Sequence, residues 1–349
     1  MSSSASSMMR TEALQAPQAV ARLLAADEPI YGALATDLHR HEPQALVTVA
    51  RGSSDHAAHY MGYLAMSRLG RLVTSLPMSL VTLYPAKLRC DGLVSLAFSQ
   101  SGQSPDLVAP ARFFTAGGAR TVAFVNDADS PLARACQWVL PLHAGAETSV
   151  AATKSFVAQL VAGARLVASW EALPKDANPA LREALASMPN ALDAATRSDW
   201  QAALPVLKEA DRLFVVGRGP GLAVALEAAL KLKETCGLQA EAFSGAELRH
   251  GPMALVDEGY PLLIFAPRGP AQAGLLELAL DLRRRGARVL LAAPVGTPGA
   301  QLPLVPTGHE DLDPIAVIQS FYLMVEQLAR ERGRDPDTPR HLAKVTRTR

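Results

Sequence analysis

The sequence predicts an α/β protein made of two tandem copies of one parallel-sheet unit. Short apolar stretches of strand type alternate with turns and helices along most of the chain, an order typical of parallel strands joined by crossover helices. The same order restarts near residue 200. At 349 residues the chain is also long enough for two typical domains.

The first half supplies the elements of one complete unit. The expected strands cover 45–50, 72–74, 93–98, 121–125 and 138–142. The expected helices cover 12–26 (broken near Pro17), 27–40, 56–68, 78–83, 105–116 and 150–172. A stretch rich in Pro, Lys, Asp and Glu over 174–189 is expected to be a linker that contains a helix.

The second half repeats the first at a constant offset of 219 − 52 = 167 residues. Four pairs hold the same place relative to a predicted strand or helix: Gly52 and Gly219, Gly70 and Gly237, Gly102 and Gly269, Val122 and Val289. We therefore expect an N-terminal tail and helix (1–29), a first unit (30–172), a linker (173–199), a second unit (200–333) and a C-terminal tail (334–349).

Charge and composition exclude several classes of function. With 34 basic and 33 acidic residues, neither nucleic acid nor a membrane surface is expected as the main partner. Cys90, Cys136 and Cys236 have no metal-ligand spacing, and a sparse, odd set of cysteines indicates a reducing compartment. No signal peptide and no apolar run of ~20 residues is present. We expect a cytoplasmic protein that uses no metal or other cofactor.

A loop of small polar residues, Ser-Gln-Ser-Gly-Gln-Ser at 99–104, joins a strand to a helix in the first half. Its N–H and O–H donors and the helix N-terminus could hold a phosphate, with Ser53 and Ser54 beside it at the same sheet edge. The alternative is a serine-rich turn that only caps the helix. In the corresponding loop at 266–271, Pro267 and Pro270 lack donors, so one phosphate site per chain is expected.

A second group of polar residues lies near the end of a predicted helix that Gly237 closes. Glu227 and Lys231 are four apart, and Lys231 and Glu234 are three apart, so the three share a helix face. A polar loop that carries His250 follows. A lysine, a carboxylate and a histidine could form an acid/base site, and the alternative is a solvated helix face with a loop histidine.

Six motifs together resemble tandem sugar isomerase (SIS) domains. More narrowly, they resemble the isomerase half of glutamine–fructose-6-phosphate aminotransferase, also called glucosamine-6-phosphate synthase. The resemblance covers about 9–344 and implies two three-layer α/β/α sandwiches of flavodoxin-like type. The motifs are Gly-Ser-Ser (52–54), Ser-Gln-Ser-Gly-Gln-Ser (99–104), Glu-Thr-Ser-Val-Ala-Ala-Thr-Lys (147–154), Leu-Lys-Leu-Lys-Glu (230–234), Glu-Leu-Arg-His-Gly-Pro (247–252) and Pro-Arg-His-Leu-Ala-Lys (339–344).

The resemblance implies roles for individual residues. Glu234 would move a proton between C1 and C2 of the sugar, and Lys231 would support the open-chain oxygens. His250 would assist ring opening from the partner subunit of a homodimer, and Lys344 could form an imine with a ketose phosphate. The implied phosphate ligands are Ser54, Ser99, Gln100, Ser101 and Ser104, and the implied sugar contacts are Gly52, Ser53 and Ala152. Ala152 replaces a serine of the synthases, which leaves the substrate open.

The synthases also carry a glutaminase domain that begins with a nucleophilic cysteine, whereas Ser2 follows Met1 here. We therefore expect a stand-alone enzyme that converts glucosamine 6-phosphate and water to fructose 6-phosphate and ammonia. Galactosamine-6-phosphate deamination, fructosamine-6-phosphate deglycation and plain aldose–ketose isomerisation stay open. A sugar-phosphate sensor is a further alternative, although its usual basic DNA-binding segment is not evident. Here Arg10, Arg22 and Arg40 are offset by Glu12, Asp27, Glu28 and Asp37.

Overall fold

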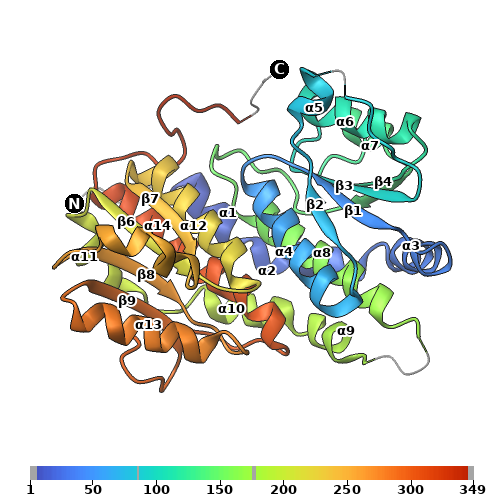
Figure 1. The fold of residues 1–349 in the computed structure, drawn as a ribbon. Helices are drawn as coiled ribbons and strands as arrows, with labels where there is room; N and C mark the ends of the chain where they lie inside the picture. The colour runs from blue at the N-terminus through green and yellow to red at the C-terminus, as the bar shows by residue number, and fades with distance from the viewer. Residues whose placement is uncertain (1–5, 85, 175–177, 345–349) are drawn as a thin grey trace. The chain divides into compact units, whose positions relative to one another are not determined.

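A computed structural model describes residues 6–84, 86–174 and 178–344 of the protein (Figure 1). The predicted N-terminal tail, linker and C-terminal tail therefore lie partly outside the described residues, at 1–5, 175–177 and 345–349. The chain forms two compact units. The first-copy unit comprises Gln18–Glu147, Lys154–Ala186 and the segment from Ala343 onward. The second-copy unit comprises the segment up to Pro17, Thr148–Thr153 and Ser187–Leu342.

The first-copy unit is built on a parallel five-stranded sheet of order β2-β1-β3-β4-β5. Its strands are β1 (Ala45–Val49), β2 (Val73–Ser75), β3 (Leu93–Ser99), β4 (Arg120–Val125) and β5 (Trp138–Pro141). Its helices are α3 (Glu28–Arg40), α4 (Ser53–Leu69), α5 (Ser79–Thr82), α6 (Pro105–Ala116), α7 (Pro131–Ala135), α8 (Lys154–Glu171) and α9 (Ala180–Leu185), and α2 (Ala16–Ala25) leads into it.

The second-copy unit repeats this topology, with strand order β7-β6-β8-β9-β10. Its strands are β6 (Arg212–Gly217), β7 (Gln239–Ser244), β8 (Pro261–Phe265), β9 (Arg288–Pro294) and β10 (Leu302–Leu304). Its α-helices are α1 (Met8–Leu14), α10 (Met188–Ala195), α11 (Leu204–Lys208), α12 (Gly221–Cys236), α13 (Gln272–Arg284) and α14 (Asp313–Glu331). Short 3₁₀ turns are η1 (Gln201–Ala203), η2 (Glu247–His250), η3 (Pro252–Leu255) and η4 (Glu310–Leu312).

Each sheet is covered by helices on both faces. In the first-copy unit α4 packs on the sheet and on α8, while α6 packs on the opposite face with α5 and α7 (Figure 1). Apolar side chains fill the layer under α6, where Val49, Leu107 and Phe114 are buried in one cluster. In the second-copy unit Val216, Ile264 and Leu278 belong to the equivalent cluster under α13. The predicted fold class, a repeated α/β/α sandwich with a parallel sheet, is confirmed.

The constant offset of the two copies is visible in the backbone. Gly70 and Gly237 both end their helices in the left-handed conformation, with φ of 65° and 62°. Helix α6 has the predicted bounds. None of the described helices is long and apolar enough to cross a lipid bilayer.

Two expectations about elements were wrong. A polar loop was expected after Gly237, but this segment contains β7, an edge strand that pairs along its length with β6. A helix was expected from residue 150, but α8 begins at Lys154. The residues before α8 are bonded elsewhere: Glu12 accepts hydrogen bonds from the backbone N–H of Thr148 at 2.5 Å and of Ser149 at 3.2 Å.

Candidate functional site

The loop Ser99–Ser104, called here the serine loop, lies at the carboxyl end of β3 and opens α6. Inside it, Ser99 Oγ accepts a hydrogen bond from Gly102 N at 2.9 Å, and Ser101 Oγ accepts one from Gln103 N at 3.3 Å. Since both hydroxyl oxygens act as acceptors, each O–H proton can be donated to a ligand. The serine loop therefore offers donors for an anion.

Gly102 is required for the shape of the serine loop. Its φ of 63° lies in the left-handed region, and an added Cβ would lie 2.1 Å from Ser130 Oγ. The backbone is also tied to its neighbours, because Gln100 O accepts from Asn126 N at 3.2 Å and Gly102 O accepts from Leu132 N at 3.1 Å. These bonds fix the loop before any ligand is present.

The serine loop ends where α6 begins, and a second helix starts beside it. Ser104 is the N-cap residue of α6, whose N-terminus favours anions. Helix α4 begins at Ser53 after Gly52, which has a φ of 54°. Since β1 and β3 are neighbours in the sheet, the starts of α4 and α6 lie at the same sheet edge.

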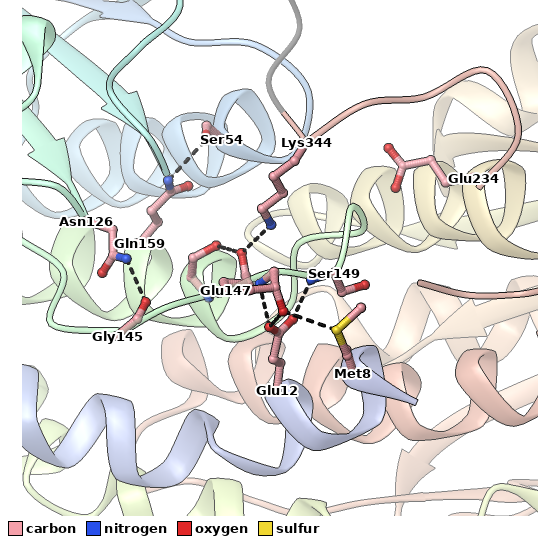
Figure 2. Close-up of polar contacts among 12 residues, drawn as sticks. Met8, Glu12, Ser54, Asn126, Gly145, Glu147, Ser149, Gln159, Glu234 and Lys344 are labelled. Atoms are coloured by element: carbon pink, nitrogen blue, oxygen red, sulfur yellow. Dashed lines mark hydrogen bonds and ion pairs between the residues drawn. The ribbon is translucent and has the colours of Figure 1, made fainter. Parts of the chain in front are cut away.

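Ser54, in the first turn of α4, is oriented by a buried side chain of α8. Gln159 is 1% exposed, and its Nε2 donates to Ser54 Oγ at 3.0 Å (Figure 2). Because the Ser54 oxygen accepts this bond, its own O–H can be directed at a ligand. The predicted phosphate ligands Ser54, Ser99, Gln100, Ser101 and Ser104 thus all lie in the first-copy unit, at or beside two helix starts.

The second group of polar residues forms a charged row on α12. Lys231, 1% exposed, lies 2.5 Å from Glu234 Oε2 and 3.3 Å from Glu227 Oε1. Glu227 is fully buried and also accepts a bond from Tyr322 Oη at 3.2 Å. Burial alone would lower the pKa of Lys231, but the charges and hydrogen bonds of Glu227 and Glu234 outweigh it and raise this pKa. Lys231 is therefore a buried cation that holds Glu234 in place.

A cavity of about 480 Å³ opens beside Glu234. The end of α12 and the segment 333–341 line it, and Lys233, Arg334, Arg340 and His341 contribute basic side chains. His250 lies in the same unit, exposed on η2. Another cavity, of about 540 Å³, lies at the amino ends of β6 and β8. None of the predicted site residues lines this second cavity, so we place no chemistry there.

Lys344 lies in the first-copy unit, next to a buried acid that the sequence did not single out. Its Nζ is 3.2 Å from Glu147 Oε2, and Figure 2 shows the two side chains pointing toward each other. Glu147 also accepts from Ser155 N at 3.1 Å and from Ser155 Oγ at 2.6 Å. Glu147 is the first residue of the motif 147–154, and this place in the motif is the signal that could have identified it.

The predicted site residues thus fall into two sets. The first-copy unit holds the predicted phosphate ligands with Gly52, Ser53 and Lys344. The second-copy unit holds Glu234, Lys231 and His250, together with half-buried Ala152 in the segment Thr148–Thr153. Within the ranges that the structure describes, no group of three or more His, Cys, Asp or Glu residues is placed to hold a metal ion.

Comparison with known proteins agrees with the fold and with the two copies. The SIS domain family model matches residues 41–169 and 206–296. A glutamine–fructose-6-phosphate aminotransferase (isomerizing) of Methanothermobacter thermautotrophicus is 32% identical over 311 residues, which cover 87% of this chain and 51% of that protein. The chain therefore spans about half the length of the aminotransferases it matches.

Solved structures are similar over nearly the whole chain. A Silicibacter pomeroyi protein, provisionally assigned as a phosphosugar isomerase, has a TM-score of 0.88 and 45% identity over 95% of this chain and 100% of that chain. A glucosamine-6-phosphate deaminase of Thermotoga maritima has a TM-score of 0.77 over 98% of this chain and 100% of that chain. Its identity of 22% supports the fold alone.

Proposed function

Because this chain belongs to the SIS domain family, we propose that it is a phosphosugar enzyme that moves a proton between C1 and C2 of its substrate. The observation that carries the proposal is the row on α12, in which buried Lys231 holds Glu234 at the edge of a cavity. A carboxylate fixed at the edge of a cavity can reach a proton of a ligand bound there, as a general base must. Its relatives include isomerizing aminotransferases and a protein assigned to the phosphosugar isomerases.

The specific reaction we propose is glucosamine 6-phosphate plus water to fructose 6-phosphate plus ammonia. His250, from a second subunit, moves the O1 proton to the ring oxygen, which opens the ring. Glu234 removes the proton from C2, and the electron pair forms an enolamine. Returning a proton to C1 gives an imine at C2. Water then adds to this imine and ammonia leaves, so that atoms and charges balance.

The other residues orient the sugar and stabilise charge. The serine loop and Ser54 hold the terminal phosphate, which places C1 and C2 at a fixed distance from the anchored end. Lys231 stabilises negative charge that develops on the open-chain oxygen. Lys344 can exchange with the imine at C2, which releases ammonia and leaves a lysine-bound ketose for hydrolysis. Glu147 positions its amino group.

Ammonia release tests the proposal directly. The purified chain is supplied with glucosamine 6-phosphate, with and without glutamine, and ammonia and fructose 6-phosphate are measured together. We expect equal amounts of both products without glutamine. A parallel reaction is supplied with fructose 6-phosphate alone. Its conversion to an aldose phosphate, with no ammonia released from glucosamine 6-phosphate, would instead support the second candidate, plain isomerisation, which the similarity to the Silicibacter protein favours. No change in any sugar phosphate would overturn both. Galactosamine 6-phosphate and fructosamine 6-phosphate serve as alternative substrates, since Ala152 leaves the sugar open.

A further inference from the structure

An arginine lies beside the serine loop and has no role in the mechanism above. Arg51 is the second residue after β1, which ends at Val49, and it directly precedes Gly52. Its Nε lies 3.2 Å from Oδ2 of Asp106, the second residue of α6 and two residues beyond Ser104. The Asp106 side chain is 3% exposed, whereas that of Arg51 is 58% exposed. A cation is therefore tethered at the mouth of the serine loop with its outer face in solvent.

Without Arg51, the negative charge of a phosphate bound at the serine loop would not be balanced. A phosphate monoester carries a charge of about −1.5 to −2 near neutral pH. The predicted ligands of the serine loop are neutral, and the carboxylate of Asp106 would repel a phosphate held at the start of the same helix. A guanidinium has five N–H donors, so one can stay on Asp106 while others bind phosphate oxygens.

The second copy supplies an internal comparison. At the offset of 167 residues, Arg218 corresponds to Arg51, but Ala273 stands where Asp106 would be. Arg218 also reaches the start of α13, since an added Cβ at Gly274 would lie 3.9 Å from its Nη1. The arginine is thus common to both copies, and the acidic partner occurs only in the copy that has the serine loop. This association favours a role in ligand binding over a role in the scaffold.

We propose that Arg51 is a phosphate clamp: Asp106 holds its Nε, and its Nη groups donate to the terminal phosphate of a substrate bound at the serine loop. The inference rests on the proposed function, because it takes the serine loop as the phosphate site. The clamp makes the site selective for dianionic phosphate esters over neutral sugars.

Binding of fructose 6-phosphate, measured by isothermal titration, tests the clamp without needing turnover. Arg51→Ala should raise the Kd about 10- to 100-fold, the usual range for a lost charge-assisted contact. Arg51→Lys should recover only part of it. The matched control is Arg120→Ala, because Arg120 pairs with Asp37 at the same 3.2 Å but starts β4 at the amino edge of the same sheet. The control should bind as the unmodified chain does.

A second variant separates clamping from simple neutralisation of Asp106. If Arg51 only balanced that carboxylate, Arg51→Ala with Asp106→Asn would bind fructose 6-phosphate as tightly as the unmodified chain, and the inference would be wrong. We expect the double variant to keep a loss of about 10-fold or more. If Ser101→Ala weakens binding while Arg51→Ala does not, only the clamp fails. If neither weakens it, the serine loop is not the phosphate site and the proposed function fails with it.

Discussion

The two copies in this chain share one scaffold but carry different polar residues at equivalent positions. In the first copy the loop after β3 is the serine loop, whose hydroxyl groups can donate hydrogen bonds to a ligand. In the second copy Arg268 stands at the position of Ser101, 167 residues later. Arg268 donates to Asp313 through Nε and Nη2, both at 2.8 Å, and to Thr307 O at 2.8 Å. In the second copy, the arginine of the equivalent loop is thus bound to Asp313, a carboxylate of the same unit.

The equivalent helices α4 and α12 differ in the opposite way, because here the second copy carries the charged residues. Helix α4 of the first copy carries Tyr60 and Leu64, both fully buried, where α12 of the second copy carries Glu227 and Lys231. The charged row of α12 therefore lies in the second copy, whose loop carries Arg268 bound to Asp313. Both copies thus keep the fold, while the first carries the serine loop and the second carries the buried charges.

The charged row should give the largest effect when it is broken. Lys231→Met leaves two carboxylates close together, one of them fully buried, and should lower the free energy of unfolding by about 3–5 kcal/mol. Denaturant unfolding measures this loss, and turnover should disappear as well. Adding Glu227→Gln should restore most of the stability but not the turnover. Full recovery of activity in that double variant would show that Lys231 serves only the fold.

Arg268→Ser in the second copy should cost stability but not affinity. Asp313 is almost fully buried, so losing its bidentate partner should lower the free energy of unfolding by about 1–3 kcal/mol. This loss is smaller than for a fully buried ion pair, because the Arg268 side chain is 39% exposed. Thermal unfolding and titration with fructose 6-phosphate check the two parts. A large loss of affinity would mean that the second loop also binds substrate.

Ser101→Ala in the first copy should give the reverse pattern. Losing one hydroxyl donor to a charged phosphate, about 1.5 kcal/mol, should raise the KM about 10-fold. The free energy of unfolding should stay within about 0.5 kcal/mol of the unmodified chain. Steady-state kinetics and denaturant unfolding measure both. An unaltered KM would remove the serine loop from the site.

The smallest expected effect is the change with pH in the stability that the charged row on α12 contributes. The pKa of Lys231 in the folded protein is raised above its ordinary 10.5. Its stabilising contribution is therefore complete below pH 10.5 and is lost as the pH rises through the folded pKa. The stability difference between the unmodified chain and Lys231→Met should be constant from pH 7 to about 10 and shrink above 10.5. A difference that shrinks below pH 9 would contradict a raised pKa.

The fold was predictable because its signals are local and repeated. Buried parallel strands give short apolar runs, and glycines such as Gly70 and Gly237 end equivalent helices. The row on α12 was predictable too, since residues three and four apart share a helix face. Strand β7 was missed because an edge strand with exposed Gln239 and Glu241 looks polar, although the offset from β2 points to it.

Contacts between distant segments could not be predicted from the sequence. Lys344 and Glu147 are 197 residues apart, and no local pattern links them. The same holds for Gln159 and Ser54, 105 residues apart, and for Arg268 and Asp313 in the second copy. Such pairs depend on how crossover helices and loops return to one sheet edge, which periodicity does not encode.

Proton exchange at the sugar tests the central claim most directly. Fructose 6-phosphate is incubated with the chain in D₂O, and deuterium at C1 is followed by NMR, for the unmodified protein and for Glu234→Gln. We expect exchange with the unmodified protein, and none with Glu234→Gln, although this variant still binds fructose 6-phosphate with nearly the same Kd. Exchange at the unmodified rate in Glu234→Gln would contradict the assignment of this glutamate as the base.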